Sequence, residues 1–258
     1  MVQVEKIFVS LGSGCAVSQR LNEAGLRKQS YPFDWLWNLE GGLEVVNDII
    51  GNDFFQFIYR SNLVTENHYR WNKKVIINRF YPNIAHIHSD PQNNEKDYQS
   101  LLRRVKKIRD LLNGKSNIQF IYFRSIEEFD PSTKHKEYSL TYCFERLLQE
   151  STEFIKIIKN KYPSLQFKLL SICMISNQQA MEDKFLIKNF VKQNYECLDF
   201  EIVYTENEIK RYKNIPVNMI AYNSWMKIFL KKNYIGLLNY LFSNAKYLAK
   251  CLVQYKLF

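Results

Sequence analysis

Short apolar runs of β-favouring residues alternate along this chain with longer stretches of helical periodicity. The apolar runs predict strands at residues 7–11, 118–123, 167–172 and 200–204. The periodic stretches predict helices at 16–24, 42–50, 94–113, 138–161 and 179–193, and residues 63–80 predict a hairpin. Because strands that alternate with long helices build parallel sheets covered on both faces, we expect an α/β fold with a mostly parallel, Rossmann-like three-layer sheet.

The domain organisation follows from linkers and charge. No Pro-, Gly- or Ser-rich linker interrupts the 258 residues, so residues 1–225 are predicted to form a single α/β domain. Residues 226–258 contain six lysines and no Asp or Glu, with apolar residues between the lysines, which predicts a basic amphipathic helical extension. Such a helix can contact an anionic membrane surface or a partner protein, or pack back on its own domain.

Cysteine usage and charge exclude several classes of protein. The five cysteines are odd in number and scattered, with no CxxC pair and no Cys/His cluster, so we expect no disulfide framework, metal site or cofactor. No apolar run reaches about 18 residues and no signal-peptide pattern is present, which predicts a cytoplasmic protein, in the host cytoplasm if the source is a virus. The formal charge of +10 comes without a zinc finger, RNP motif or helix-turn-helix, so nucleic acid is not an expected partner.

The first predicted strand leads directly into a candidate site. Residues 7–11 are followed by Gly12-Ser13-Gly14-Cys15 and then by helical periodicity, so Cys15 is predicted at a helix N-terminus, past the carboxyl end of a parallel strand. The first-turn amides and the helix dipole are expected to lower the pKa of its thiol below the free value of about 8.5. Cys15 is thus a candidate nucleophile; the alternative is a small residue packed beneath a tight turn.

Two histidines and one carboxylate are candidates to act with this thiol. His86 and His88 have strand spacing, which places both side chains on one face, and either is predicted as the base. Each one alone also fits a structural histidine. Asp34 follows Pro32 within an aromatic segment, and we predict a site acid or the group that orients the histidine; an Asx turn or helix cap is the alternative.

Three arginines are candidates for binding an anionic substrate group. Arg124 stands at the end of a predicted strand, and a guanidinium there is placed to hold a carboxylate or phosphate. Arg79 is predicted to do likewise, and Arg27 is predicted to pair with Asp34. Convergence of these side chains in space is an expectation that only a structure can test.

The chain also resembles a known family in two segments near its start. Residues 9–15 (VSLGSGC) and 25–35 (GLRKQSYPFDW) resemble a family of bacteria and large DNA viruses labelled "putative papain-like cysteine peptidases". Residues 78–80, His86 and the segments 98–112 and 120–124 continue the pattern, so the resemblance covers roughly half of the chain.

The label implies a cysteine, a histidine and an orienting asparagine in the papain order. Asn223-Ser224-Trp225 resembles the Asn-Ser-Trp around that asparagine, which makes Asn223 a further candidate. This chain departs from the papain pattern at the nucleophile. No glutamine stands a few residues before Cys15 to supply an oxyanion donor, and no tryptophan follows Cys15.

Three classes of function remain open at this point, and whether the chain is an enzyme stays undecided. The first is a cysteine-dependent hydrolase or acyl transferase acting on a peptide or an anionic small molecule, with the backbone amides of residues 14–16 holding the oxyanion. The second is a Rossmann-like domain that binds a phosphate or nucleotide sugar at Gly12, Ser13 and Gly14, with a non-catalytic Cys15. The third is a non-catalytic interaction module that presents residues 226–258.

Overall fold

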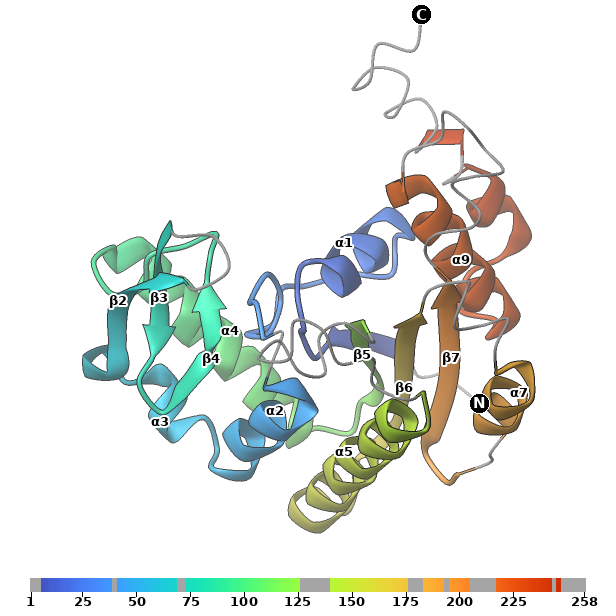
Figure 1. Ribbon diagram of the computed structural model, residues 1–258. Helices are drawn as coiled ribbons and strands as arrows, with labels where there is room; N and C mark the ends of the chain where they lie inside the picture. The colour runs from blue at the N-terminus through green and yellow to red at the C-terminus, as the bar shows by residue number, and fades with distance from the viewer. Residues whose placement is uncertain are drawn as a thin grey trace, which may run out of the picture.

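The main sheet of the protein has four parallel strands. The computed structural model describes residues 6–38, 41–68, 73–125, 140–175, 183–192, 195–204, 217–242 and 245–246. Within them the strands lie in the order β1-β5-β6-β7, as Figure 1 shows. Their bounds are β1 (Lys6–Ser10), β5 (Asn117–Ser125), β6 (Gln166–Ile175) and β7 (Leu198–Tyr204). The mixed α/β fold with a mostly parallel sheet is therefore confirmed.

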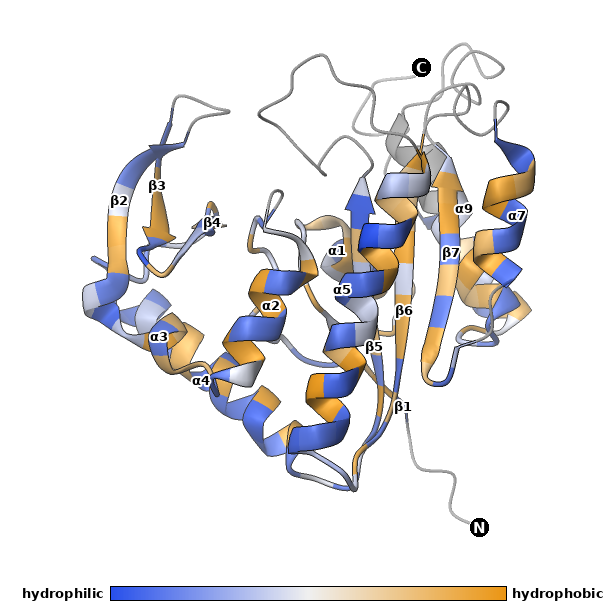
Figure 2. Cartoon of the chain, turned by 60° about the horizontal axis from the view of Figure 1, so that its bottom comes forward, coloured by the Kyte–Doolittle hydropathy of each residue, from blue (hydrophilic) through white to orange (hydrophobic). Residues whose placement is uncertain are grey.

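Helices pack on both faces of this sheet because its central strands are apolar on both sides. In β5, Phe120 and Tyr122 belong to one core cluster while Ile121 and Phe123 belong to the other, as strand alternation requires. The first cluster contains apolar residues of α2 (Gly42–Gly51), α4 (Glu95–Leu112), α5 (Leu140–Lys161) and α7 (Lys184–Lys192), together with Phe57. Two helices cover the second cluster: α1 (Ala16–Glu23) and α9 (Val217–Lys231). Figure 2 shows apolar stretches along these strands and apolar residues on one side of α5.

A small antiparallel sheet lies beside the main one, on the side away from β7 (Figure 1). Its strands are β2 (Leu63–His68), β3 (Lys73–Asn78) and β4 (Tyr81–His86). The short elements α3 (Phe55–Ile58) and η1 (Arg60–Asn62) precede it. The predicted hairpin at 63–80 is thus confirmed as β2 and β3, and a third strand extends it.

The start of the predicted extension belongs to the core. Helix α9 runs across residue 226, and Trp225, Met226 and Phe229 on it are buried in the cluster that contains Phe123. Burial of these apolar side chains holds α9 on the sheet. Residues 247–258 lie outside the described residues, so the boundary at 226 and the basic extension stay predictions. None of the helices in the described ranges is long and apolar enough to cross a membrane.

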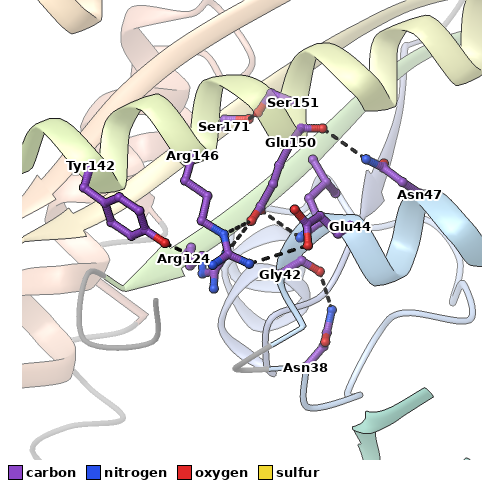
Figure 3. A network of polar contacts seen from close by, with 11 residues as sticks. Asn38, Gly42, Glu44, Asn47, Arg124, Tyr142, Arg146, Glu150, Ser151 and Ser171 are labelled. Atoms are coloured by element: carbon purple, nitrogen blue, oxygen red, sulfur yellow. Dashed lines mark hydrogen bonds and ion pairs between the residues drawn. The ribbon is translucent and has the colours of Figure 1, made fainter. Parts of the chain in front are cut away.

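A buried ion pair joins β5 to α5 (Figure 3). Arg124 Nη1 donates to Glu150 Oε1 over 2.8 Å, and neither side chain is exposed. Arg146, one turn before Glu150, donates to the same oxygen over 2.9 Å. Two cations thus share one carboxylate inside the protein. Each of these buried charges needs a partner of opposite sign, because an unpaired buried charge costs several kcal/mol.

The same carboxylate fixes the beginning of α2. Glu150 Oε2 accepts the backbone N–H of Leu43 over 3.0 Å, one of the donors that the first turn of a helix leaves free. Gly42 has a φ of +58°, and a Cβ there would lie 2.8 Å from both carboxylate oxygens and closer still to Arg124, so glycine is required. The Gly42 carbonyl accepts from Asn38 Nδ2 over 2.6 Å. Through Asn38 the network anchors the loop that precedes α2.

Candidate active site

Cys15 lies where the sequence predicts it, between a strand and a helix. The turn after β1 has positive φ at Gly12 (+90°) and Ser13 (+77°), and Cys15 is the N-cap residue of α1. Its thiol is half-buried. A Cβ on Gly12 would make only ordinary contacts, so the backbone conformation is what favours glycine there. The predicted strand–turn–helix arrangement is therefore confirmed.

His88 is the histidine that meets this thiol. Cys15 Sγ and His88 Nε2 lie 3.0 Å apart, which is hydrogen-bond distance. The thiol can donate to Nε2 in the tautomer that leaves this nitrogen unprotonated. His88 is exposed and follows the end of β4 at His86, in a bend. The fold therefore brings a thiol and an imidazole together from segments 73 residues apart.

His86, the other predicted base, is a core residue. It is 4% exposed and stacks on Phe57, with ring centroids 6.3 Å apart. Burial, with a smaller effect of Arg104, lowers its pKa to about 4, so the ring is neutral at pH 7. Strand alternation predicted both histidines on one face, but β4 ends at His86 and the bend turns His88 elsewhere. Of these two histidines, the structure brings His88 to Cys15.

Trp37 is a second side chain that contacts the sulfur, and no spacing pattern in the sequence predicts it. Its indole Nε1 donates to Cys15 Sγ over 3.3 Å. The backbone of Trp37 pairs with Ala85 of β4 through hydrogen bonds of 3.1 Å and 2.8 Å. This bridge between the loop before α2 and β4 could not be read from the local pattern. It places Trp37 and His88 at the same edge of the small sheet.

The pKa of the Cys15 thiol is raised, whereas the helix N-terminus predicts a lowered pKa. Burial raises the pKa of Cys15, and the hydrogen bonds from Trp37 and from its own backbone N–H lower it by less. The position at a helix N-terminus is visible in the sequence, whereas the burial that outweighs it is not. Cys15 is therefore a neutral thiol at pH 7. Reaction at neutral pH requires a base that removes its proton.

Asp34 does not contact either histidine through any hydrogen bond of the described residues. Its Oδ1 accepts from Ser18 Oγ over 2.8 Å. Its Oδ2 accepts from Arg27 over 2.8 Å and 3.1 Å and from the Tyr31 backbone N–H over 3.0 Å. The carboxylate is 2% exposed and joins α1 to the aromatic loop. The predicted pairing with Arg27 is present, and the other hydrogen bonds of Asp34 go to Ser18 and Tyr31.

Arg27 is part of the same network, since its Nη2 also donates to Ser30 Oγ over 2.7 Å, and its role toward a substrate stays a prediction. Besides Asp34, its guanidinium lies 5.7 Å from the centre of the Trp35 ring. Trp35 in turn meets the His88 ring edge-on, with centroids 5.9 Å apart. A chain of contacts therefore runs from Asp34 through Arg27 and Trp35 to the imidazole.

The remaining candidates lie away from the thiol or outside the description. Arg124 was predicted to bind an anionic group, but its ion pair with Glu150 buries it in the core. Arg79 is exposed and precedes β4, whereas His88 follows it; six strand residues at about 3.3 Å each separate them by roughly 20 Å. Asn223 lies in α9, and its side chain is outside the described residues. Across the described ranges, no three side chains of His, Cys, Asp or Glu are placed to hold a metal ion.

Comparisons with known proteins point to one family. The sequence model of the family described as "Putative papain-like cysteine peptidase (DUF1796)" matches residues 6–207. The chain is also similar to "Uncharacterized protein R408" of Acanthamoeba polyphaga mimivirus, with 38% identity over 53 residues. That similarity covers 20% of this chain and 23% of the viral protein. No solved structure matches the chain.

Proposed function

Because this chain belongs to the family described as putative papain-like cysteine peptidases, we propose that it is a cysteine-dependent hydrolase or acyl transferase. Cys15 is the nucleophile and His88 is the base. The observation that carries this proposal is the distance of 3.0 Å between Cys15 Sγ and His88 Nε2. A nucleophile within hydrogen-bond reach of a base is the minimal arrangement for covalent catalysis by a thiol.

The raised pKa of the thiol sets how the first step occurs. As Sγ attacks the carbonyl carbon, the thiol proton passes to His88 Nε2, and the carbonyl π electrons move to the oxygen. When the tetrahedral intermediate collapses, the leaving group departs with the proton held by His88, and an acyl thioester remains on Cys15. Water or a second acceptor then takes the acyl group and restores the thiol.

The beginning of α1 supplies candidate donors for the oxyanion. The N–H of Gln19 is bonded to the Cys15 carbonyl at 3.0 Å, so the N–H groups of Ala16 and Val17 come before the first bond within the helix. Their position next to the nucleophile supports the prediction that backbone amides around residues 14–16 stabilise the oxyanion. Asn223 stays a prediction as the group that orients His88.

Several finer predictions belong with this proposal. The substrate is proposed to be a peptide or an anionic small molecule, and the protein is proposed to act in the cytoplasm. The Rossmann-like description of the sheet and a phosphate site at residues 12–14 also stay predictions. The described strands follow one another without the reversal of order at which nucleotides bind in doubly wound sheets. We therefore favour the thiol chemistry.

The C-terminal segment supports a separate proposal of peripheral membrane contact. Four large apolar side chains on residues 237–242 are exposed: Leu237, Leu238, Leu241 and Phe242. Lys246 Nζ lies 4.4 Å from the centre of the Phe242 ring. Residues 233–258 carry lysines and no Asp or Glu, which suits a surface of anionic lipids.

The function is tested by trapping the acyl group. The protein is incubated at pH 7 with p-nitrophenyl acetate, and peptides of the quenched protein are analysed by mass spectrometry. We expect a burst of nitrophenol with one acetyl group on Cys15. Cys15→Ser should show no burst as fast as that of the wild type. In the wild-type protein, the buried Cys143 and Cys173 should stay unmodified. Acetylation distributed over several residues, with no burst, would contradict the proposal.

A further inference from the structure

We infer that Trp37 is a catalytic residue of this site: its indole N–H stabilises the negative charge that develops on the Cys15 sulfur. The inference rests on the proposed function and deepens it. It assigns a side-chain donor to the Cys15 sulfur, a role different from that of the oxyanion-binding glutamine that the papain resemblance implies and that this chain lacks near Cys15.

The direction of the hydrogen bond is fixed by chemistry. An indole nitrogen carries a proton and cannot accept, so Trp37 Nε1 donates to Cys15 Sγ over their 3.3 Å in every protonation state. His88 Nε2, 3.0 Å from the same sulfur, is different because it accepts before proton transfer and donates afterwards. Besides the backbone N–H of Cys15, the sulfur thus has one side-chain donor that is permanent, Trp37, and one that donates only after the proton has moved, His88.

This donor acts more strongly on the anion than on the thiol. A thiol sulfur is a weak acceptor, whereas hydrogen bonds to charged groups are about twice as strong as neutral ones. The bond therefore strengthens as the proton leaves Cys15. Only interactions that strengthen toward the transition state accelerate a reaction. Because burial disfavours the thiolate here, a donor aimed at the sulfur offsets part of that cost.

The indole is held in place before any substrate arrives. The backbone of Trp37 makes two hydrogen bonds to Ala85, and its ring packs against the small cluster of Val75, Ile77 and Ala85. The next residue, Asn38, is tied to the start of α2 through the Gly42 carbonyl. A donor fixed in this way needs no reorganisation when charge develops, which is the basis of electrostatic preorganisation.

Replacing Trp37 tests the inference in the full-length protein. Alkylation of Cys15 by iodoacetamide is followed from pH 6 to 11 by mass spectrometry of the Cys15 peptide. In Trp37→Phe we expect the apparent thiol pKa to rise by about one unit, so that alkylation at pH 7 slows about tenfold. The burst with p-nitrophenyl acetate should slow by at least as much.

A matched replacement separates the N–H from the bulk of the ring. Incorporation of 3-benzothienylalanine at position 37 keeps the shape of the indole and replaces only its N–H by sulfur. We expect this variant to show the same shift as Trp37→Phe. It also serves if Trp37→Phe fails to fold. An unchanged thiol pKa and a burst rate within twofold of wild type in the benzothienyl variant would overturn the inference.

The two proposals fail in different ways. If the wild-type protein shows a Cys15-dependent burst that the benzothienyl variant retains, the proposed function stands and the role of Trp37 is refuted. If the wild-type protein shows no burst on Cys15, the proposed function fails, and the catalytic role of Trp37 fails with it.

Discussion

Removing the charge of Glu150 should destabilise the fold more than removing both charges of its ion pair. In Glu150→Gln, the amide oxygen can still accept from the Leu43 N–H, but Arg124 loses its counter-ion while remaining fully buried. Breaking one side of such a pair costs about 3–5 kcal/mol. Because Arg146 also points at this carboxylate, two cations would face each other, which places the expected loss toward the upper end.

The double variant Arg124→Met with Glu150→Gln also replaces the buried guanidinium by a neutral side chain. We expect it to recover roughly 2 kcal/mol relative to Glu150→Gln, because neutral, packed replacements of buried pairs are close to neutral in stability. The measurement is urea unfolding at pH 7 followed by circular dichroism, with unchanged m-values required for the comparison.

An exposed pair provides the matched control. Lys106 and Asp110 on α4 form an ion pair of 2.6 Å, with both side chains more than half exposed. Asp110→Asn should change the unfolding free energy by less than about 0.5 kcal/mol. A loss below about 1 kcal/mol for Glu150→Gln, or a double variant less stable than Glu150→Gln, would refute the argument that the buried charges are coupled.

Three further predictions follow from other parts of the molecule. The pKa of His86 is lowered to about 4 in the folded protein and is about 6.5 when unfolded, so the unfolded state binds the proton first as pH falls. The free energy of unfolding should therefore drop by about 3 kcal/mol between pH 6.5 and pH 4, and His86→Leu should remove this dependence. Equal pH profiles of urea unfolding for the two proteins would contradict the prediction. Asp34→Ala removes the acceptor of Ser18 and of the Tyr31 N–H and one acceptor of Arg27, so unfolding measurements should show a loss of about 3 kcal/mol. The burst on Cys15 should also slow, and an unchanged burst would show that this loop does not position the site. Sedimentation with phosphatidylserine vesicles should carry down the wild-type protein and not Leu238→Glu with Leu241→Glu, and equal sedimentation would rule out this face as the membrane contact.

The elements of the fold could be predicted because each carries a strong local pattern. The predicted strand at 118–123 becomes Asn117–Ser125, and the predicted helix at 94–113 becomes Glu95–Leu112. The strand is buried on both faces, as its continuous apolar run indicates, and the helix is buried on the side that its periodicity defines, so sequence and tertiary structure agree. The position of Cys15 between strand and helix was predictable for the same reason.

The rest of the site depends on contacts between distant segments. The choice between His86 and His88 depends on where β4 ends, because the bend after this strand brings His88 to the thiol and leaves His86 in the core. Arg124 looked like an anion-binding group because its partner, Glu150, lies on another element, 26 residues away. Trp37 reaches Cys15 through its pairing with Ala85, and no pattern along the chain predicts that pairing.

The same limit applies to the electrostatics of the thiol. The sequence shows the helix N-terminus, which favours the thiolate, but not the burial that opposes it. Burial of Cys15 is produced by residues from the loop before α2 and from the bend after β4, both far from it in sequence. The direction of the pKa shift therefore required the folded structure.

The central claim, that His88 removes the proton from Cys15, is tested most directly by the burst rate with p-nitrophenyl acetate at pH 7. The rate is compared among wild type, His88→Ala and His86→Ala, each checked for fold by circular dichroism. Loss of a positioned general base should slow the burst by about 10²–10⁴-fold in His88→Ala, while His86→Ala should stay within about threefold of wild type. A His88→Ala protein that acetylates Cys15 at the wild-type rate would contradict the account.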